Sequence, residues 1–313
     1  MTSAVVMDRA AVEAAVSPVR AVEAVRDAFV AHARGEWSMP PKVYVTNYPA
    51  GDFRAMPALG GGHALLKWIT SFPGNPARGL PTVTGIVLVS DAETGELQAV
   101  LDAASVTALR TGAAAVLAAE TLGRADARTA AVIGAGVNGR ASARTFVARG
   151  RSVALWDVDA SRAAEVAAEL GCDVAASQDE ALAADLVVTV TPGHEVVLPE
   201  GSLRPGQHVS LMGADGPGKA EAAGAELARA HLFCDDWEQA SHGGELAHAV
   251  EAGLVAEGDV TAIGAVLAGT ADGRADDAEI TMFDSTGLAI QDLAIALAAL
   301  DGADRAGLPR LEL

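Results

Sequence analysis

The sequence predicts an α/β protein with two domains, and three observations indicate this class. The chain has 313 residues, the length of about two average domains. Its first hundred residues alternate short apolar runs with turn residues, which favours a mostly antiparallel sheet within an α+β domain. From residue 130 onward apolar runs alternate with helical patterns, which predicts a parallel sheet with helices on both faces. We expect one domain over residues 1–117, completed by a C-terminal helix at about 288–313, and a second over 118–287.

The first domain is expected to begin with two helices. Asp8 can cap a short helix, and Ser17 followed by Pro18 is typical of the cap and first position of a second one. Gly35 lies where this second helix would end. The strands expected after it are 42–46, 53–57, 64–71, 82–90 and 97–101.

The second domain is expected to follow a long alanine-rich helix, which Asp102 opens and which ends near Gly123. The strands expected beyond this helix are 130–133, 152–156, 185–191, 207–213, 231–234 and 279–284. A last helix is expected over 288–300, and it would return to the first domain.

A glycine motif lies directly after the first of these strands. Gly134, Gly136 and Gly139 have the spacing G-x-G-x-x-G between a strand and a helix, which is the context of a dinucleotide-binding βαβ unit. Asp157, at the end of the next strand, can accept hydrogen bonds from ribose hydroxyls and would repel a 2′-phosphate, so NAD is expected rather than NADP. The expected cofactor-binding residues here are Gly134, Gly136, Val137, Asn138, Gly139 and Asp157.

Composition excludes several classes of protein. The net charge of −19 argues against partners that are nucleic acids or anionic membranes. Cys172 and Cys234 are isolated, which favours a cytoplasmic protein without a disulfide framework. No apolar run suits a signal peptide or a membrane span. His194, His242 and His248 lack metal-ligand spacing, so no metal is expected.

Three cations interrupt apolar patterns in the first domain: Lys42, Lys67 and Arg110. Lysine is seldom fully buried without a partner, so Lys67 would either lie on an exposed strand face or point into a binding cleft. Arg110 would be either an ordinary exposed helix residue or a residue whose planar guanidinium binds a carboxylate through two hydrogen bonds. If Lys67 points into a cleft and Arg110 binds a carboxylate, the two residues belong to a site for an anionic substrate.

Asp215 lies in a glycine-rich turn after the strand that ends near Gly213. Ligands of open α/β sheets bind beyond the carboxyl ends of the strands, so Asp215 is a candidate for moving a proton. The alternative is an aspartate that caps a helix beginning near Gly218.

Seven short motifs together resemble one known family. In chain order they are Phe72-Pro73-Gly74-Asn75, Gly79-Leu80-Pro81-Thr82, Asp91-x-x-Thr94-Gly95, Leu109-Arg110-Thr111, Gly134-Ala135-Gly136-Val137, Gly213-Ala214-Asp215-x-Pro217-Gly218-Lys219 and Phe283-Asp284-Ser285-x-Gly287. They cover nearly the whole chain and resemble the ornithine cyclodeaminase/μ-crystallin family. The family includes ornithine and lysine cyclodeaminases, an archaeal alanine dehydrogenase, reductases of cyclic imino acids, and the hormone-binding μ-crystallin.

The resemblance implies a Rossmann domain that binds NAD(P), together with an α+β domain that binds substrate and forms a homodimer. It implies that Lys67 and Arg110 bind the substrate carboxylate, and that Lys42 is close to a third cationic position. It also implies that Asp215 is an acid/base residue, paired in catalysis with Lys67, and that Thr111 lies near the cofactor.

Arg54 departs from the pattern of the cyclodeaminases. Their branch of the family has an acidic residue thirteen positions before the substrate lysine, where this chain has Arg54, whereas the archaeal alanine dehydrogenases resemble it in having arginine there. A guanidinium in the site would repel the second ammonium of ornithine. The alternative is that Arg54 points into solvent.

These observations predict an NAD-dependent oxidoreductase that acts on a C–N bond. It would interconvert an L-amino acid and its 2-oxo acid plus ammonia, or reduce a cyclic imino acid. The alternatives are an ornithine or lysine cyclodeaminase that recycles its NAD, and a non-catalytic ligand-binding protein. The presence of both Asp215 and Lys67 favours catalysis.

Overall fold

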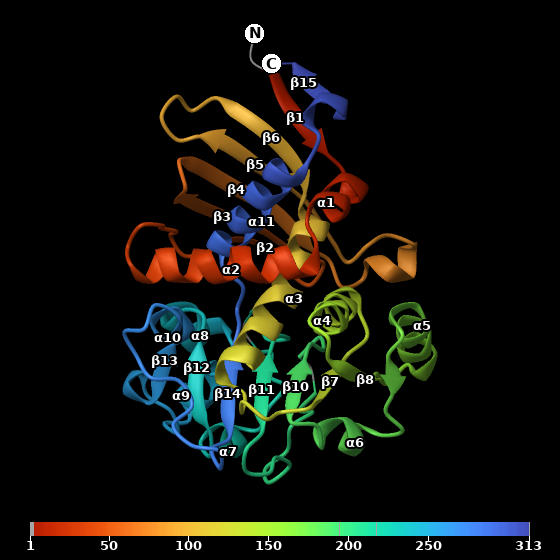
Figure 1. Ribbon diagram of the computed structural model, residues 1–313, viewed down its shortest axis with the longest axis vertical. Helices are drawn as coiled ribbons and strands as arrows, with labels where there is room; N and C mark the ends of the chain where they lie inside the picture. The colour runs from red at the N-terminus through yellow and green to blue at the C-terminus, as the bar shows by residue number, and fades with distance from the viewer. Residues whose placement is uncertain (1–2, 194, 217, 313) are drawn as a thin grey trace. The chain divides into compact units, whose positions relative to one another are not determined.

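The computed structural model describes residues 3–193, 195–216 and 218–312, which form two compact units (Figure 1). The first unit comprises Met1–Arg110 and Leu288–Leu313, and the second comprises Thr111–Gly287. The division falls inside helix α3 (Ala103–Leu122). The predicted α/β class is confirmed, because the first unit is a mixed sheet with helices and the second is a parallel sheet with helices.

The first unit contains a seven-stranded sheet in the order β15-β1-β6-β5-β4-β3-β2. Its strands are β1 (Ser3–Met7), β2 (Val43–Asn47), β3 (Gly51–Gly60), β4 (His63–Ser71), β5 (Val83–Asp91), β6 (Leu97–Asp102) and β15 (Arg310–Glu312). Only β1 and β6 pair in parallel; the other neighbours are antiparallel, as predicted. Neither β1 nor β15 was predicted from the sequence; β15 is three residues long and exposed.

Three helices belong to this unit: α1 (Arg9–Ala15), α2 (Pro18–Ala33) and α11 (Ala289–Gly302). Asp8 and Ser17 cap the first two as predicted, since Asp8 Oδ1 accepts from the Ala11 N–H at 2.9 Å and Ser17 Oγ accepts from the Arg20 N–H at 3.2 Å. Helix α11 is buried along nearly its whole length and packs against α2 and strands β3 to β5. A helix that is apolar all round must be covered on all sides.

The face of the sheet opposite α11 leaves large apolar side chains exposed. Strand pairing puts the alternating residues of β2 to β5 on one face, because successive side chains of a strand point to opposite sides. The exposed members of this face are Val43, Val45, Leu59, Leu66, Trp68 and Ile86. We call these six residues the open sheet face. Large exposed apolar patches mark interaction sites, so the open sheet face is a candidate interaction surface.

The second unit contains an eight-stranded parallel sheet in the order β13-β12-β14-β11-β10-β7-β8-β9. Its strands are β7 (Thr129–Ile133), β8 (Ser152–Trp156), β9 (Asp173–Val174), β10 (Leu186–Thr189), β11 (His208–Leu211), β12 (His231–Cys234), β13 (Val260–Ala262) and β14 (Thr281–Asp284). The helices that follow α3 are α4 (Val137–Ala148), α5 (Ala160–Leu170), α6 (Gln178–Leu182), α7 (Gly224–Leu227), α8 (Trp237–Gly243), α9 (Ala247–Glu251) and α10 (Ile263–Leu267). Strand order reverses at β7, between β8 and β10, as in doubly wound nucleotide-binding sheets.

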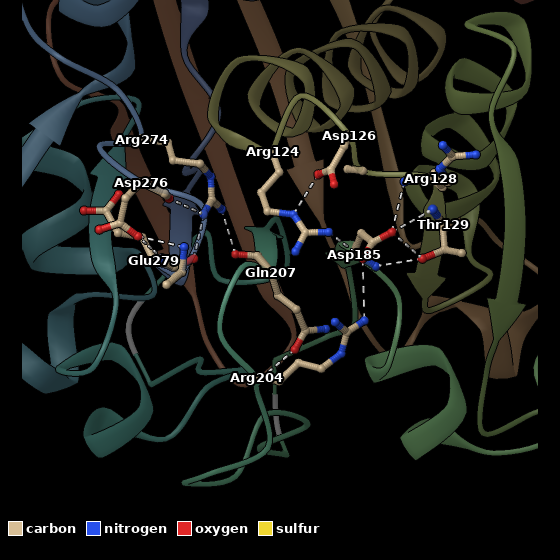
Figure 2. Close-up of polar contacts among 12 residues, drawn as sticks. Arg124, Asp126, Arg128, Thr129, Asp185, Arg204, Gln207, Arg274, Asp276 and Glu279 are labelled. Atoms are coloured by element: carbon tan, nitrogen blue, oxygen red, sulfur yellow. Dashed lines mark hydrogen bonds and ion pairs between the residues drawn. The ribbon is translucent and has the colours of Figure 1, made fainter.

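A polar network joins the amino ends of these parallel strands (Figure 2). All five N–H groups of Arg274 have acceptors. Nε donates to Leu122 O at 2.8 Å, Nη1 to Asp276 O and Glu279 O, and Nη2 to Gln207 O and Thr281 Oγ1. These bonds tie the C-terminus of α3 to the starts of β11 and β14, which makes Arg274 a structural residue.

Asp185 has the corresponding role on the other side of this network. Its Oδ2 accepts from the Arg128 N–H at 2.9 Å and from the N–H and hydroxyl of Thr129 at 3.1 and 3.0 Å. Burial opposes ionisation, but these hydrogen bonds and the nearby Arg124 hold the pKa of Asp185 down at about 2. In the described part of the chain, no helix is long and apolar enough to cross a membrane.

Candidate active site

Two of the predicted cations share one buried carboxylate in the first unit. Lys67, on β4, is 1% exposed, and its Nζ lies 2.9 Å from Oδ1 of Asp292 on α11. Arg110, on α3, brings Nε to 3.6 Å from the same oxygen. The expectation that Lys67 could lie on an exposed strand face is therefore wrong, and Arg110 is not an exposed helix residue, since its side chain is 12% exposed.

The surroundings of Lys67 change its acidity. Burial lowers the pKa of its ammonium most, the positive charges of Arg110 and Lys42 lower it as well, and the attraction and hydrogen bond of Asp292 oppose them, so that the pKa is about 8. A lysine whose pKa is close to the ambient pH can both bind an anion and transfer a proton. Lys67 therefore has the properties of a catalytic lysine as well as those of a substrate ligand.

The charges around Asp292 do not balance. One carboxylate faces two cations, Lys67 and Arg110. In the described part of the chain, Nε of Arg110 and Oδ2 of Asp292 are buried and make no hydrogen bond. Buried polar atoms are nearly always paired in folded proteins, so such exceptions call for a missing partner. An anionic group that binds here would supply the negative charge that the cluster lacks.

Arg54 lies on the same sheet face as Lys67. Strand β3 pairs with β4 so that Met56 is opposite Lys67, and Arg54 is two residues before Met56. Its Nε lies 2.6 Å from Oδ1 of Asp52, and its guanidinium carbon lies 5.3 Å from the ring centre of Tyr44. With 12% of its side chain exposed, Arg54 does not point into solvent. The charge of Arg54 is however offset by Asp52, and this ion pair was not predicted from the sequence.

The glycine loop of the second unit has the shape that the motif predicts. Gly134 has a φ of 105°, which only glycine adopts readily, and a Cβ on Gly139 would lie within 1.7 Å of the Gly134 carbonyl. A Cβ on Gly136 would meet nothing within 4 Å, so this residue faces open space. Gly136 is also the N-cap of α4 and provides no side-chain cap. The first N–H groups of α4 are thus available to a phosphate, and these residues fit a dinucleotide.

Asp157 joins this loop to the end of β8. Its Oδ2 accepts from the Ala135 N–H at 2.7 Å, and its Oδ1 accepts from the Asp159 N–H at 2.8 Å. A carboxylate oxygen can accept more than one hydrogen bond, so ribose hydroxyls could still donate to it. Arg162 Nη1, 3.6 Å from Asp157 Oδ1, adds a positive charge that would favour a 2′-phosphate.

Thr111 differs from the other threonines of α3. The hydroxyls of Thr107 and Thr121 donate to carbonyls four residues back, at 2.6 and 2.7 Å. Thr111 is 2% exposed, and its hydroxyl has no hydrogen-bond partner in the described part of the chain. The next residue, Gly112, packs so closely on α4 that a Cβ would lie 2.6 Å from Ala141 O. Thr111 is thus held beside the helix that begins at the glycine loop, with an unused hydroxyl.

Asp215 lies in the loop that follows β11. Its Oδ1 is 2.6 Å from Nζ of Lys219, four residues on, and both side chains are partly exposed. In the described residues no helix begins near Gly218, because the next helix is α7 at Gly224. The helix-cap alternative for Asp215 is therefore wrong. Lys219 is a functional candidate that the sequence reading missed, although it stands in the quoted Gly213–Lys219 motif.

A buried glutamate fixes the base of this loop. Glu221 accepts from the Thr189 hydroxyl at 2.7 Å, the Thr191 N–H at 2.7 Å and the Gly213 N–H at 2.8 Å. A Cβ on Gly213 would come within 2.5 Å of the Glu221 carboxyl carbon, so this arrangement requires glycine there. Burial raises the pKa of Glu221, while the three hydrogen bonds oppose that shift. The carboxylate thereby positions the loop two residues before Asp215.

The described histidines belong to no group of side chains that could hold a metal ion. His242 is exposed, and its Nδ1 lies 2.8 Å from Glu238 O. His194 lies outside the described residues. Among the residues that the structure describes, no three His, Cys, Asp or Glu side chains are grouped so that they could hold a metal ion.

The chain resembles known proteins over nearly its whole length. The sequence profile of the ornithine cyclodeaminase/mu-crystallin family matches residues 2–305. The chain is 42% identical over 302 residues to an alanine dehydrogenase of Archaeoglobus fulgidus, covering 93% of this chain and 92% of that protein.

Two solved structures resemble the fold closely. One is an archaeal alanine dehydrogenase dimer with bound NAD (TM-score 0.94, 39% identity, 99% of each chain). The other is the iminosuccinate reductase of Paracoccus denitrificans in complex with NAD+ (TM-score 0.91, 31% identity, 99% of this chain and 100% of that one). The chain belongs to the ornithine cyclodeaminase/mu-crystallin family.

Proposed function

We propose that this protein is an NAD-dependent oxidoreductase that acts on a C–N bond. It would convert a 2-oxo acid, ammonia and NADH into an L-amino acid, or reduce a preformed imino acid. The observation that carries the proposal is the buried cluster of Lys67 and Arg110 around the single carboxylate of Asp292, with the positive Lys42 nearby. The dinucleotide-binding loop and the NAD-bound relatives support it.

Lys67 and Arg110 would bind the substrate carboxylate, with Lys42 adding to the positive potential. A carboxylate supplies the negative charge that the cluster lacks, and charge-assisted hydrogen bonds are the strong ones. Because the pKa of Lys67 is about 8, its ammonium could also donate a proton to the carbonyl oxygen that leaves as water. Asp215 would be the second proton carrier, and the ammonium of Lys219, 2.6 Å away, would orient its carboxylate.

NAD would be held by Gly134, Gly136, Val137, Asn138 and Gly139 at the start of α4 and by Asp157 at the ribose. When bound, its reduced form would supply the hydride that adds to the carbon of the C=N bond, while the nitrogen takes a proton. The unused hydroxyl of Thr111 would donate a hydrogen bond to the cofactor, since it has no other partner in the described residues.

Arg54 bears on the substrate class. The alanine dehydrogenase and the iminosuccinate reductase act on substrates that carry no second ammonium, and a positive side chain at Arg54 suits such substrates. Asp52 offsets this charge, so repulsion of ornithine would be weaker than for a lone guanidinium. The carboxylate of Asp52 is already engaged by Arg54, so it would be a poor acceptor for the distal ammonium of a cyclodeaminase substrate.

The open sheet face would bury against a second copy of the chain. Its six apolar side chains are exposed together on one face, with Val43 at 56%, and a contiguous apolar patch of this kind is suited to a protein interface. The archaeal alanine dehydrogenase is described as a dimer. Light scattering of the purified protein should give the mass of a dimer, and Trp68→Glu on this face should shift it toward the monomer.

The direct test is a screen for NADH oxidation. Small 2-oxo acids with ammonia, and preformed cyclic imino acids, are offered separately at saturating NADH. Ornithine and lysine are run beside them and assayed for cyclic product, because a cyclodeaminase shows no net change in NADH. The proposal predicts NADH oxidation with a 2-oxo acid plus ammonia or with a cyclic imino acid. If neither class oxidises NADH and ornithine gives a cyclic product, the protein is a cyclodeaminase and the proposal is wrong.

A further inference from the structure

Asp292 stands at the centre of the cation cluster, although its position in the sequence is remote. It lies in the first turn of α11, 225 residues from Lys67, and its side chain is 0% exposed. The charged groups that face Lys67 from the surrounding elements are Asp292 on α11, Arg110 on α3 and Lys42 before β2. The Asp52–Arg54 pair lies on the same face of β3 and carries no net charge.

This carboxylate is bonded less completely than that of the buried Glu226 in the second unit. Glu226 accepts from two backbone N–H groups and from Arg229, with both oxygens in use. Asp292 has one oxygen engaged with Lys67 and approached by Arg110, whereas its buried Oδ2 makes no hydrogen bond in the described residues. An acid placed only for stability would be expected to use both oxygens.

We propose that Asp292 is a positioning residue, which holds the ammonium of Lys67 and the guanidinium of Arg110 together as one carboxylate-binding pair and keeps Lys67 charged until the substrate carboxylate arrives. This role rests on the proposed function, because it assigns the two cations to an anionic substrate. Lys67 is fully buried beside other positive groups, so without Asp292 its charged form would lose its compensating partner. Without Asp292, Lys67 and Arg110 would no longer be held together, and part of the Lys67 population would be neutral.

A labelling experiment can follow Lys67 without any substrate. The chain has three lysines, Lys42, Lys67 and Lys219, so protein labelled with 13C and 15N in lysine gives three side-chain signals. Lys67→Met assigns its signal by removing it. In the wild type that signal should titrate near pH 8. In Asp292→Asn it should titrate lower, by about one pH unit or more, because the attraction that opposes burial is lost.

Asp185→Asn is the matched control. It removes the charge of a hydrogen-bonded aspartate in the second unit, where Asp185 pairs with Arg124 and Arg204. This variant should lower the unfolding temperature but leave the Lys67 titration unchanged. An equal titration of Lys67 in wild type and Asp292→Asn, or a shift of the same size in Asp185→Asn, would overturn the proposal.

Steady-state kinetics provide the second readout. In Asp292→Asn, KM for the oxo or imino acid should rise about tenfold to a hundredfold while the NADH dissociation constant stays the same. Asp292→Glu keeps the negative charge, so Lys67 should titrate as in the wild type. Its KM should lie between those of the wild type and Asp292→Asn. If Asp292→Asn does not fold, Asp292→Glu decides alone: a raised KM with the wild-type Lys67 titration supports positioning, and an unchanged KM contradicts it.

The two readouts separate this proposal from the proposed function. If the wild type reduces none of the oxo or imino acids but Asp292→Asn still moves the Lys67 titration, the proposed function fails and the coupling of Asp292 to Lys67 stands. If the wild type is active and neither the titration nor KM responds to Asp292→Asn, the proposed function stands and Asp292 has no positioning role.

Discussion

Two partly buried arginines of this protein have contrasting surroundings. Arg274, in the second unit, donates all five of its N–H groups to carbonyl oxygens and one hydroxyl (Figure 2). Arg110, in the first unit, has a buried Nε without a hydrogen bond in the described residues and lies 3.6 Å from a carboxylate that it shares with Lys67. A saturated guanidinium has no capacity left for a ligand, whereas an unsaturated one beside a second cation has.

From this difference we expect Arg274 to support stability and Arg110 to support substrate binding. The partners of Arg274 are backbone groups at the starts of strands, so its loss leaves several buried carbonyls unpaired. The partner of Arg110 is one acid that already holds Lys67, so its loss removes positive charge from a cluster with a surplus. The same residue type should therefore produce different phenotypes when it is replaced in the two places.

The largest expected effect is on the proton carrier of the second unit. Asp215→Asn keeps the shape of the side chain and removes its charge, and positioned acid–base groups contribute about 10²–10⁴-fold to rate. We expect kcat to fall within that range, with an unfolding temperature close to that of the wild type, because Asp215 caps no helix. A large loss of stability with little loss of kcat would instead make Asp215 a structural residue.

The arginine pair gives the next largest effect. Arg274→Met should destabilise the protein by about 2–4 kcal/mol, since buried acceptors lose their donors. Arg110→Met should raise KM for the oxo or imino acid about tenfold to a hundredfold, with little change in stability. Thermal unfolding and KM are measured on both variants. Equal losses of stability in the two would remove the distinction between them.

The pH dependence of substrate binding should follow Lys67. Its ammonium binds the substrate carboxylate, and its pKa is about 8, so KM should rise above that pH as the proton is lost. Each further pH unit should weaken binding by up to about tenfold until Arg110 alone remains. The pH profile of kcat/KM in wild type and Lys67→Arg checks this, since arginine stays charged and should remove the alkaline decline.

Stability should respond to acid through the network of the second unit. Burial lowers the pKa of His208 to about 3, and its ring lies between Thr281 Oγ1 and Ser210 Oγ. Below pH 6.5 the imidazole of the unfolded chain takes up a proton, whereas that of the folded chain stays neutral. The free energy of unfolding therefore falls as the pH drops below 6.5, by at most about 1.4 kcal/mol for each pH unit. Urea unfolding of His208→Gln between pH 7 and 4 should show a flatter dependence than the wild type.

The smallest effect concerns the choice of cofactor. Asp157 favours the ribose hydroxyls of NADH, whereas Arg162 at 3.6 Å would partly accommodate a 2′-phosphate. We expect NADH to bind more tightly than NADPH, and Arg162→Ala to widen the gap. Fluorescence titration with both cofactors measures this, and tighter binding of NADPH to the wild type would make the role given to Asp157 wrong.

Local signals could be predicted from the sequence, whereas distant partners could not. The caps at Asp8 and Ser17 and the glycine loop depend on residues a few positions apart, and the structure has them where they were expected. The two- and three-residue strands β9, β13 and β15 are too short to show a periodicity. Lys67 and Arg110 could be selected because they interrupt apolar patterns.

The acids that complete the site were missed for a physical reason. Asp292 contacts Lys67 only because α11 returns to the sheet of the first unit, and no spacing rule connects residues so far apart. A single acid in the apolar run of α11 was nevertheless a usable signal, because burying it requires a partner. Asp52 could have been found from strand periodicity, since it is two residues before Arg54 and therefore on the same face.

Direct binding of a substrate analogue tests the central claim, that the Lys67–Arg110 cluster is the carboxylate site of an oxidoreductase. Oxamate resembles a small 2-oxo acid but does not accept the hydride, so calorimetry can measure its affinity for the NADH complex. The account predicts that oxamate binds the wild type and Arg274→Met alike, and that Arg110→Met and Lys67→Met weaken binding about tenfold or more. Equal affinity in all four proteins would contradict it.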